Sequence, residues 1–183
     1  MNWAFDLATN TGWAVGRQCD PVGDVKIYSG QAPKSPDEVP SGVLLASAKR
    51  AMMTVDSGAW DLRPRRGDGP GMRAVLLRRN LNDLLGAYGK PELVTYEDCI
   101  MQGQAAREIL YGLRMTLQGW CEENKIGGYR SVNTTSLKGF AHRVTGLKGK
   151  LKELDCAAAT ILAGREINNN DEADAILLLF SVL

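Results

Sequence analysis

The chain has 183 residues, 44% of them hydrophobic, which is enough to bury one substantial core within the size range of a single domain. Four cysteines without any Cys-x-x-Cys pair argue against a zinc ribbon or a disulfide framework and favour a reducing cytoplasm (Cys19, Cys99, Cys121 and Cys156). No apolar run reaches the roughly 18–20 residues of a membrane span, and Asp6 places a charge where a signal peptide is apolar. We therefore expect one cytoplasmic domain over residues 1–183.

The charges are distributed unevenly, although the formal net charge is only +1. A stretch without any acid carries the basic residues Lys138, His142, Arg143, Lys148, Lys150 and Lys152. A second basic cluster comprises Arg63, Arg65 and Arg66. Acids gather instead at Glu153 and Asp155 and between Glu166 and Asp174. This pattern is typical of a nucleic-acid-binding face beside an acidic pocket, with an ordinary solvated surface as the open alternative.

The N-terminal segment predicts a β-hairpin with an acid at its mouth. Residues 2–7 alternate bulky and small apolar groups around Asp6, residues 9–12 are turn-forming, and residues 13–15 resume the extended pattern. A third strand has two candidates, Val25–Ser29 and Val55–Leu62, between which the sequence does not choose. A helix from about Ser41 to Met53 is expected between them.

The remainder of the chain alternates helices and strands. After a loop rich in proline and glycine at residues 63–71, apolar residues recur at helical spacing from Met72 to about Ala87. The elements expected next are strand Glu92–Glu97, helix Gln104–Asn124, strand Tyr129–Val132, a helix from Thr134 or Thr135 to about Val144, helix Lys150–Ala163, and a last helix that begins near Asn170 or Asp171. A three-stranded meander followed by alternating helices and strands predicts a mixed α/β sheet flanked by helices.

Carboxylates stand at the positions where such a fold can gather them. Asp6 and Glu97 end two strands that can lie side by side, and Asp171 and Asp174 share one face of a helix because they are three residues apart. Oxygen ligands favour Mg²⁺ or Mn²⁺ over zinc. Two such ions about 3.5–4 Å apart can activate a water and stabilise the leaving 3′ oxygen during hydrolysis of a phosphodiester. The four acids are therefore candidate metal ligands and catalytic residues.

Each acid also has a purely structural interpretation. Asp6 could cap the turn at residues 9–12, Glu97 could pair with a nearby arginine, and Asp171 or Asn170 could serve only as a helix N-cap. A strand-end carboxylate in an apolar context nevertheless needs a cation or a hydrogen-bonding partner, since burial of an isolated charge is costly. That requirement favours the metal site.

Four segments resemble motifs of the RuvC-like family of Holliday junction resolvases. Residues 5–14 (FDLATNTGWA) resemble its first catalytic motif, residues 94–97 (VTYE) its strand-end glutamate before a long helix, and residues 170–175 (NDEADA) the Asp-x-x-Asp-Ala that closes its active site. Residues 135–138 (TSLK) and the segment from Thr145 to Lys152 resemble the basic region that contacts DNA. Residues 57–62 (SGAWDL) are similar to the phage-encoded branch of the family.

The resemblance implies a ribonuclease H-like fold with a five-stranded sheet, and a Mg²⁺- or Mn²⁺-dependent endonuclease that acts as a homodimer on four-way junctions in DNA recombination or repair. Its metal ligands would be Asp6, Glu97, Asp171 and Asp174. Lys138 and Lys152 would meet phosphates near the cut, with Lys148 or Lys150 as alternatives to Lys152. If the chain is phage-encoded, it would act in the cytoplasm of the host.

Three features depart from the family pattern. The segment from about residue 17 to 53 resembles an insertion into the domain. Where bacterial members carry an aromatic wedge after the second acid, this chain has Ile100 and Met101, which could open a base step or anchor the loop. His142 is expected to contact phosphate or solvent rather than to transfer a proton.

Other functions stay open on the sequence. A nuclease of this fold could act on forks, flaps or RNA, and a junction-binding module could carry the same acids without cutting. An actin-like kinase also opens on an aspartate-bearing strand, but this chain is too short for two lobes and has no glycine-rich adenosine loop.

Overall fold

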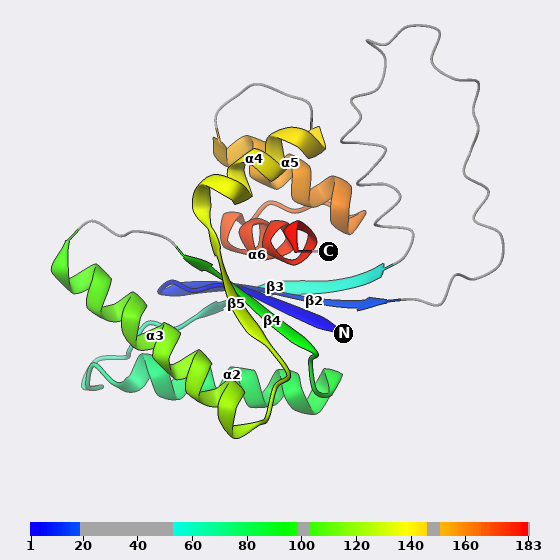
Figure 1. Ribbon diagram of the computed structural model, residues 1–183. Coiled ribbons are helices and arrows are strands. Elements are labelled where there is room, and N and C mark those ends of the chain that lie inside the picture. The colour runs from blue at the N-terminus through cyan, green and yellow to red at the C-terminus, as the bar shows by residue number, and fades with distance from the viewer. Residues whose placement is uncertain (19–52, 99–102, 146–150, 183) are drawn as a thin grey trace, which may run out of the picture.

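The computed structural model describes residues 1–18, 53–98, 103–145 and 151–182 (Figure 1). Its centre is one five-stranded sheet with the strand order β3-β2-β1-β4-β5. The strands are β1 (Asn2–Asp6), β2 (Asn10–Gln18), β3 (Met53–Asp61), β4 (Leu93–Asp98) and β5 (Tyr129–Asn133). The first three form an antiparallel meander, and β4 and β5 run parallel to β1. The expected mixed sheet is confirmed.

The third strand is the second of the two candidates. Strand β3 pairs with β2 along its whole length, from Gln18 opposite Met53 to Asn10 opposite Asp61. Met53 therefore begins a strand and does not end a helix, and Arg17 and Gln18 extend β2 and do not open an insertion. The candidate strand Val25–Ser29 and the remainder of the expected helix and insertion lie outside the described residues.

Helices cover both faces of the sheet (Figure 1). On one face lie α2 (Met72–Tyr88) and α3 (Gln104–Glu123), and on the other lie α4 (Thr134–Thr145), α5 (Leu151–Ala163) and α6 (Asn170–Ser181). Within the described parts of the chain, no helix is both long and apolar enough to cross a membrane.

The two faces of the sheet carry side chains of different size, because successive residues of a strand point to opposite sides. Trp3 and Phe5 of β1 enter the core beneath α2 and α3, where Trp3 stacks on Trp120 of α3 at 5.8 Å between ring centroids. Ala4 of β1 and Ala14 of β2 enter the core beneath α6. The small residues on this side allow α6 to lie close to the sheet.

Gly12 of β2 shows how close that approach is. A Cβ atom at Gly12 would lie 1.6 Å from the backbone carbonyl oxygen of Asp171, at the start of α6. Gly12 is the residue paired with Asp6 across the hairpin. The absence of a side chain at Gly12 therefore brings the first turn of α6 directly beside the end of β1.

Candidate active site

Asp6 and Glu97 lie side by side at one edge of the sheet. Strands β1 and β4 are parallel with Phe5 opposite Tyr96, so the next residue of each strand brings the two carboxyl groups together. Both side chains point to the face that α6 covers, and both residues are only 7% exposed. Two acids so deeply buried need protons, cations or donors to compensate their charge.

Asp171 lies in the first turn of α6, and Asp174 lies at the start of the next turn. The N-cap of this helix is Asn169, whose side chain accepts a hydrogen bond of 3.1 Å from the backbone N–H of Glu172. The interpretation of Asp171 or Asn170 as the N-cap is therefore wrong. Since Asn169 caps the helix, the Asp171 carboxylate is not needed for that purpose.

The four predicted acids form one electrostatic cluster. Burial raises the pKa of Asp6 well above its ordinary value, and the nearby charges of Asp174, Glu97 and Asp171 raise it further, as does a hydrogen bond from the protonated Asp6 carboxyl group to Glu97. Burial also raises the pKa of Asp174 to about 7, with added repulsion from Asp155, Glu97 and Asp171. Side chains from β1, β4 and α6 thus converge on one place.

Asp155 of α5 is a fifth member that the sequence interpretation missed. It is 9% exposed, and burial is the main cause of its raised pKa, which the charges of Lys138 and His142 oppose and that of Glu97 reinforces. A signal was available in the sequence. Asp155 shares a helical face with Ala158, Ala159 and Leu162, all fully buried, so an acid stands on an apolar stripe.

Thr11 stabilises the turn after β1, and Arg114 pairs with the neighbour of Glu97. The turn after β1 is held by Thr11, whose hydroxyl donates to the carbonyl oxygen of Ala8 at 2.8 Å. Arg114 forms a salt bridge of 2.6 Å with Asp98 and donates to the backbone carbonyl oxygen of Glu97 at 3.4 Å. The carboxyl groups of Asp6 and Glu97 interact with each other within the cluster.

Basic residues of α4 border this cluster. Lys138 is half-buried, and its charge lowers the pKa of both Asp155 and Asp174. His142 is half-buried and acts on Asp155 in the same way. Arg143 is exposed, with its guanidinium 5.9 Å from the centre of the Phe140 ring. Lys148 and Lys150 lie outside the described residues, and Lys152 lies in α5 with its side chain outside them.

The arginine cluster follows β3 at the same edge of the sheet. Asp61 ends β3 opposite Asn10, and the backbone N–H of Leu62 donates to the carbonyl oxygen of Thr9, so the chain leaves β3 beside the hairpin turn. Arg63 forms a salt bridge of 2.8 Å with Asp61 and lowers the pKa of that acid to about 2. All three side chains of the arginine cluster are exposed: Arg63, Arg65 and Arg66. The wedge candidates Ile100 and Met101 lie outside the described residues.

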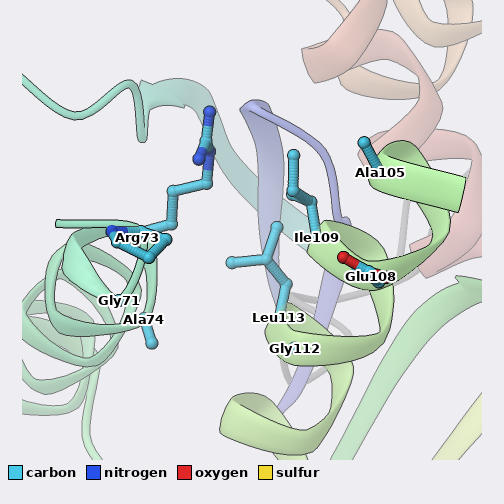
Figure 2. Close-up of a pocket in the computed structure, with 9 residues that line it drawn as sticks. Gly71, Arg73, Ala74, Ala105, Glu108, Ile109, Gly112 and Leu113 are labelled. Atoms are coloured by element: carbon cyan, nitrogen blue, oxygen red, sulfur yellow. The ribbon is translucent and has the colours of Figure 1, made fainter.

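A pocket of about 350 Å³ opens on the opposite helical layer, between the start of α2 and the N-terminal half of α3. Figure 2 shows Arg73 and Ala74 of α2 on one wall and Ala105, Ile109 and Leu113 of α3 on the other. None of the five acids lines this pocket. The candidate chemistry therefore belongs to the edge of the sheet and not to this cavity.

The donor set of the cluster fits a hard divalent cation. Among the described residues, no three histidine, cysteine or acidic side chains form a ready-made metal-binding group. The acids of the cluster nevertheless offer only carboxylate oxygens, which Mg²⁺ and Mn²⁺ prefer. Since the raised pKa values of Asp6 and Asp174 come from burial and mutual repulsion, a cation could replace the protons that otherwise compensate these charges.

No family model and no curated protein sequence matches this chain. Solved structures do match. A structure described as Thermus thermophilus RuvC in complex with a Holliday junction substrate has a TM-score of 0.65 and 10% sequence identity, over 98% of this chain and 90% of that one. The chain has the fold of RuvC. A second structure of Thermus thermophilus RuvC has a TM-score of 0.63 and 12% identity, over 98% of this chain and 91% of that one.

The RuvC fold accounts for the position of the cluster. In this ribonuclease H-like arrangement the ends of β1 and β4 meet at one edge, and α6 crosses the sheet with its N-terminus there. The similarity at 10–12% identity is one of fold.

Replacement of Asp174 by asparagine is expected to stabilise the metal-free protein at pH 8. Between pH 3.8 and about 7, the Asp174 carboxyl group holds a proton in the folded protein, whereas the same group is ionised in the unfolded chain. The free energy of unfolding therefore falls as the pH rises through this range, up to the folded-state pKa of about 7. Asp174→Asn removes this loss of unfolding free energy, because asparagine does not ionise. We expect a gain of about 2 kcal/mol or more at pH 8, which corresponds to roughly 4–8 °C in melting temperature. Asp155→Asn should act in the same direction with a smaller effect, because its charge raises the pKa of Asp174.

Thermal melts in EDTA at pH 4 and pH 8 measure this effect. The advantage of Asp174→Asn should be small at pH 4 and full at pH 8. Asp83→Asn, an exposed change on α2, is the control and should leave the melting temperature unaltered at both values. An Asp174→Asn protein no more stable than the wild type at pH 8 would contradict the repulsion within the cluster.

Proposed function

We propose that this protein is a metal-dependent endonuclease that nicks branched DNA, with four-way junctions as its main substrate. The observation that carries the proposal is the convergence of buried acids from β1, β4 and α5 and half-buried acids from α6 at one edge of a RuvC-like sheet. Such a group of like charges lowers the stability of the fold, as the raised pKa values of Asp6 and Asp174 indicate. A functional role explains why the chain retains this destabilising cluster, because groups with strongly shifted pKa values are typical of functional sites.

In this proposal Asp6, Glu97, Asp171 and Asp174 hold Mg²⁺ or Mn²⁺, with two ions in each site. Bound divalent cations supply Lewis-acid activation of water and charge stabilisation at the scissile phosphate. The protein itself fixes the oxygen donors, since Asp6 and Glu97 are anchored in paired strands and Asp171 and Asp174 in a capped helix. Asp155 lies near both Lys138 and the carboxylates of Glu97 and Asp174, so it can complete the ligand set or orient the lysine.

The basic residues around this edge are proposed to hold the DNA backbone. Lys138 borders the acids, so it can meet a phosphate beside the scissile bond. Arg143, Arg63, Arg65 and Arg66 are exposed and can contact phosphates farther away. Contacts of this kind give affinity that falls steeply with salt and carry no sequence information. The matched Thermus thermophilus structure is described as a complex with a Holliday junction substrate, which favours the same class of DNA here.

A homodimer is part of the proposal. A four-way junction offers two equivalent strands to a two-fold symmetric enzyme, so paired nicks require two copies of the site. The exposed face of α3 supports such an assembly because Tyr111 and Met115, four residues apart, are 66% and 49% exposed. Val75 of the neighbouring helix α2 is 56% exposed. Large apolar side chains in these positions favour contact with a second protein surface.

Nicking of a synthetic four-way junction tests the proposal. In Mg²⁺ or Mn²⁺ we expect paired nicks at symmetric positions and little cutting of a linear duplex with the same arm sequences. In Ca²⁺ or EDTA we expect binding without cutting. Equal cutting of junction, fork and duplex would indicate a nuclease of broad specificity, and junction binding without cutting in any divalent cation would indicate a binding module.

A further inference from the structure

A three-residue network joins the edge strand β3 to the first turn of α6. The hydroxyl of Ser57 in β3 donates to Glu172 Oε1 in α6 at 2.9 Å. Arg165, in the loop between α5 and α6, donates from one guanidinium nitrogen to Ser57 Oγ at 2.6 Å and to Glu172 Oε1 at 2.5 Å. The same nitrogen lies 3.3 Å from the backbone carbonyl oxygen of Ser57. We call these residues the Ser57–Arg165–Glu172 clamp.

The contacts of the clamp are partly buried, which increases the free-energy cost of breaking them. The Glu172 side chain is only 14% exposed, and Ser57 is half-buried, while Arg165 is 46% exposed. A hydrogen bond between partly buried groups is costly to leave unmade, because a lost partner leaves the other group desolvated. The clamp therefore constrains the helix more than an exposed ion pair would.

Glu172 is the acid in the first turn of α6 that does not belong to the cluster. Successive residues of an α-helix turn by about 100°, so Glu172 points away from the face that Asp171 and Asp174 share. Attachment of Glu172 to β3 sets the rotation of α6 about its own axis. It also keeps a third carboxylate of the same helical turn out of the cluster.

We propose that the Ser57–Arg165–Glu172 clamp is a positioning device for the metal site, and this inference rests on the function proposed above. The clamp holds the first turn of α6 so that Asp171 and Asp174 face Asp6 and Glu97. None of its residues touches the reacting phosphate. Its loss should weaken divalent-cation binding without a matching loss of folding or of DNA affinity.

The clamp also explains the segment SGAWDL at residues 57–62. A Cβ atom at Gly58 would lie 3.0–3.1 Å from the indole of Trp13, so glycine leaves room for that ring. Trp60 stacks on Trp13 with 5.9 Å between ring centroids, and Leu62 is fully buried. The other residues of the motif thus fix β3 on the sheet while Ser57, on the opposite face, fastens α6.

The test combines Ser57→Ala and Glu172→Gln with the conservative variant Ser57→Thr, which keeps the hydroxyl. Mn²⁺ binding by calorimetry in the absence of DNA is the first readout, and the Mg²⁺ concentration for half-maximal nicking of a four-way junction is the second. Residues that orient metal ligands typically change metal affinity or activity by about 10–100-fold when replaced. We expect Ser57→Ala and Glu172→Gln each to weaken Mn²⁺ binding about 10-fold, and Ser57→Thr to stay near wild type.

Arg78→Met is the matched control. It breaks the exposed salt bridge between Arg78 of α2 and Glu123 of α3, far in the fold from α6, and should change neither readout. Ser57→Ala combined with Glu172→Gln should weaken Mn²⁺ binding little more than either change alone, since one removes the hydroxyl donor and the other the charge of the acceptor in the same network. Melting temperatures should fall by no more than a few degrees for Ser57→Ala and Glu172→Gln, so the proteins stay folded, and junction affinity in Ca²⁺ should stay close to wild type for every variant.

The outcomes separate the clamp from the function on which it rests. Normal Mn²⁺ binding in both Ser57→Ala and Glu172→Gln would overturn the clamp and leave the nuclease proposal standing. An equal loss in Ser57→Thr and Ser57→Ala would overturn it too, because the hydroxyl would then be irrelevant. A wild-type protein that neither binds Mn²⁺ nor cuts junctions would overturn the proposed function itself.

Discussion

Asp6→Asn is expected to slow the nicking of a four-way junction by roughly three orders of magnitude or more, because cation-assisted stabilisation of phosphoryl transfer amounts to several kcal/mol. Asp6 is central to the cluster, since its pKa responds to Glu97, Asp171 and Asp174 together. Asparagine keeps the size of the side chain and removes its charge. Glu97→Gln should have a comparable effect from the neighbouring strand.

Binding to the junction should survive the same changes. The proposed phosphate contacts come from Lys138, Arg143 and the arginine cluster, not from the acids. Gel-shift titrations in Ca²⁺ should therefore give dissociation constants for Asp6→Asn and Glu97→Gln within a few-fold of wild type. Asp83→Asn, an acid-to-amide change on the exposed side of α2, serves as the control and should cut normally. A fully active Asp6→Asn protein would refute the proposed metal site.

Gly12→Ala is expected to be the most damaging small substitution outside the acids. The added Cβ atom would lie 1.6 Å from the carbonyl oxygen of Asp171 and 2.3 Å from its carbonyl carbon. No rotamer change relieves a clash with backbone, so the first turn of α6 must move away from the sheet. We expect a loss of about 3 kcal/mol or more in unfolding free energy, or roughly 6–12 °C in melting temperature.

The same displacement should separate Asp171 and Asp174 from Asp6. Gly12→Ala should therefore also weaken Mn²⁺ binding at temperatures where the protein remains folded, which calorimetry can measure beside the thermal melt. Gly86→Ala is the matched control because Gly86 is an exposed position of α2 with no atom within 4 Å of an added Cβ. That change should be neutral or stabilising by up to about 1 kcal/mol, as alanine favours a helix. Equal melting temperatures for the two variants would contradict the close approach of α6.

Gly12 and the Ser57–Arg165–Glu172 clamp act on the same helical turn in different ways. The glycine sets how near α6 lies to β2, and the clamp sets how the helix is rotated. The two acids of that turn are expected to need both conditions, since a cation site tolerates little error in the placement of its donors. The two contacts together make α6 the element on which the candidate site depends.

The sequence by itself determined the order and type of the elements, and it identified four of the five acids of the cluster. The alternation of large and small apolar groups in β1, the short apolar run of β4 and the period of about 3.6 residues in α2, α3 and α5 all reflect burial, so they are legible without the fold. Strand-end positions made Asp6 and Glu97 candidates, and the three-residue spacing did the same for Asp171 and Asp174. Their convergence could be expected because parallel strands bring equivalent ends to one edge.

Only the tertiary structure decided which segment is the third strand and what each polar side chain meets. Pairing with β2 along its full length selects Met53–Asp61. Packing of α5 against α4 and α6 places Asp155 beside Lys138 and Asp174, and Arg114 of α3 forms a salt bridge with Asp98 of β4. Local periodicity shows only that a residue is buried, whereas its partners come from distant segments that the register of the sheet brings within a few ångströms.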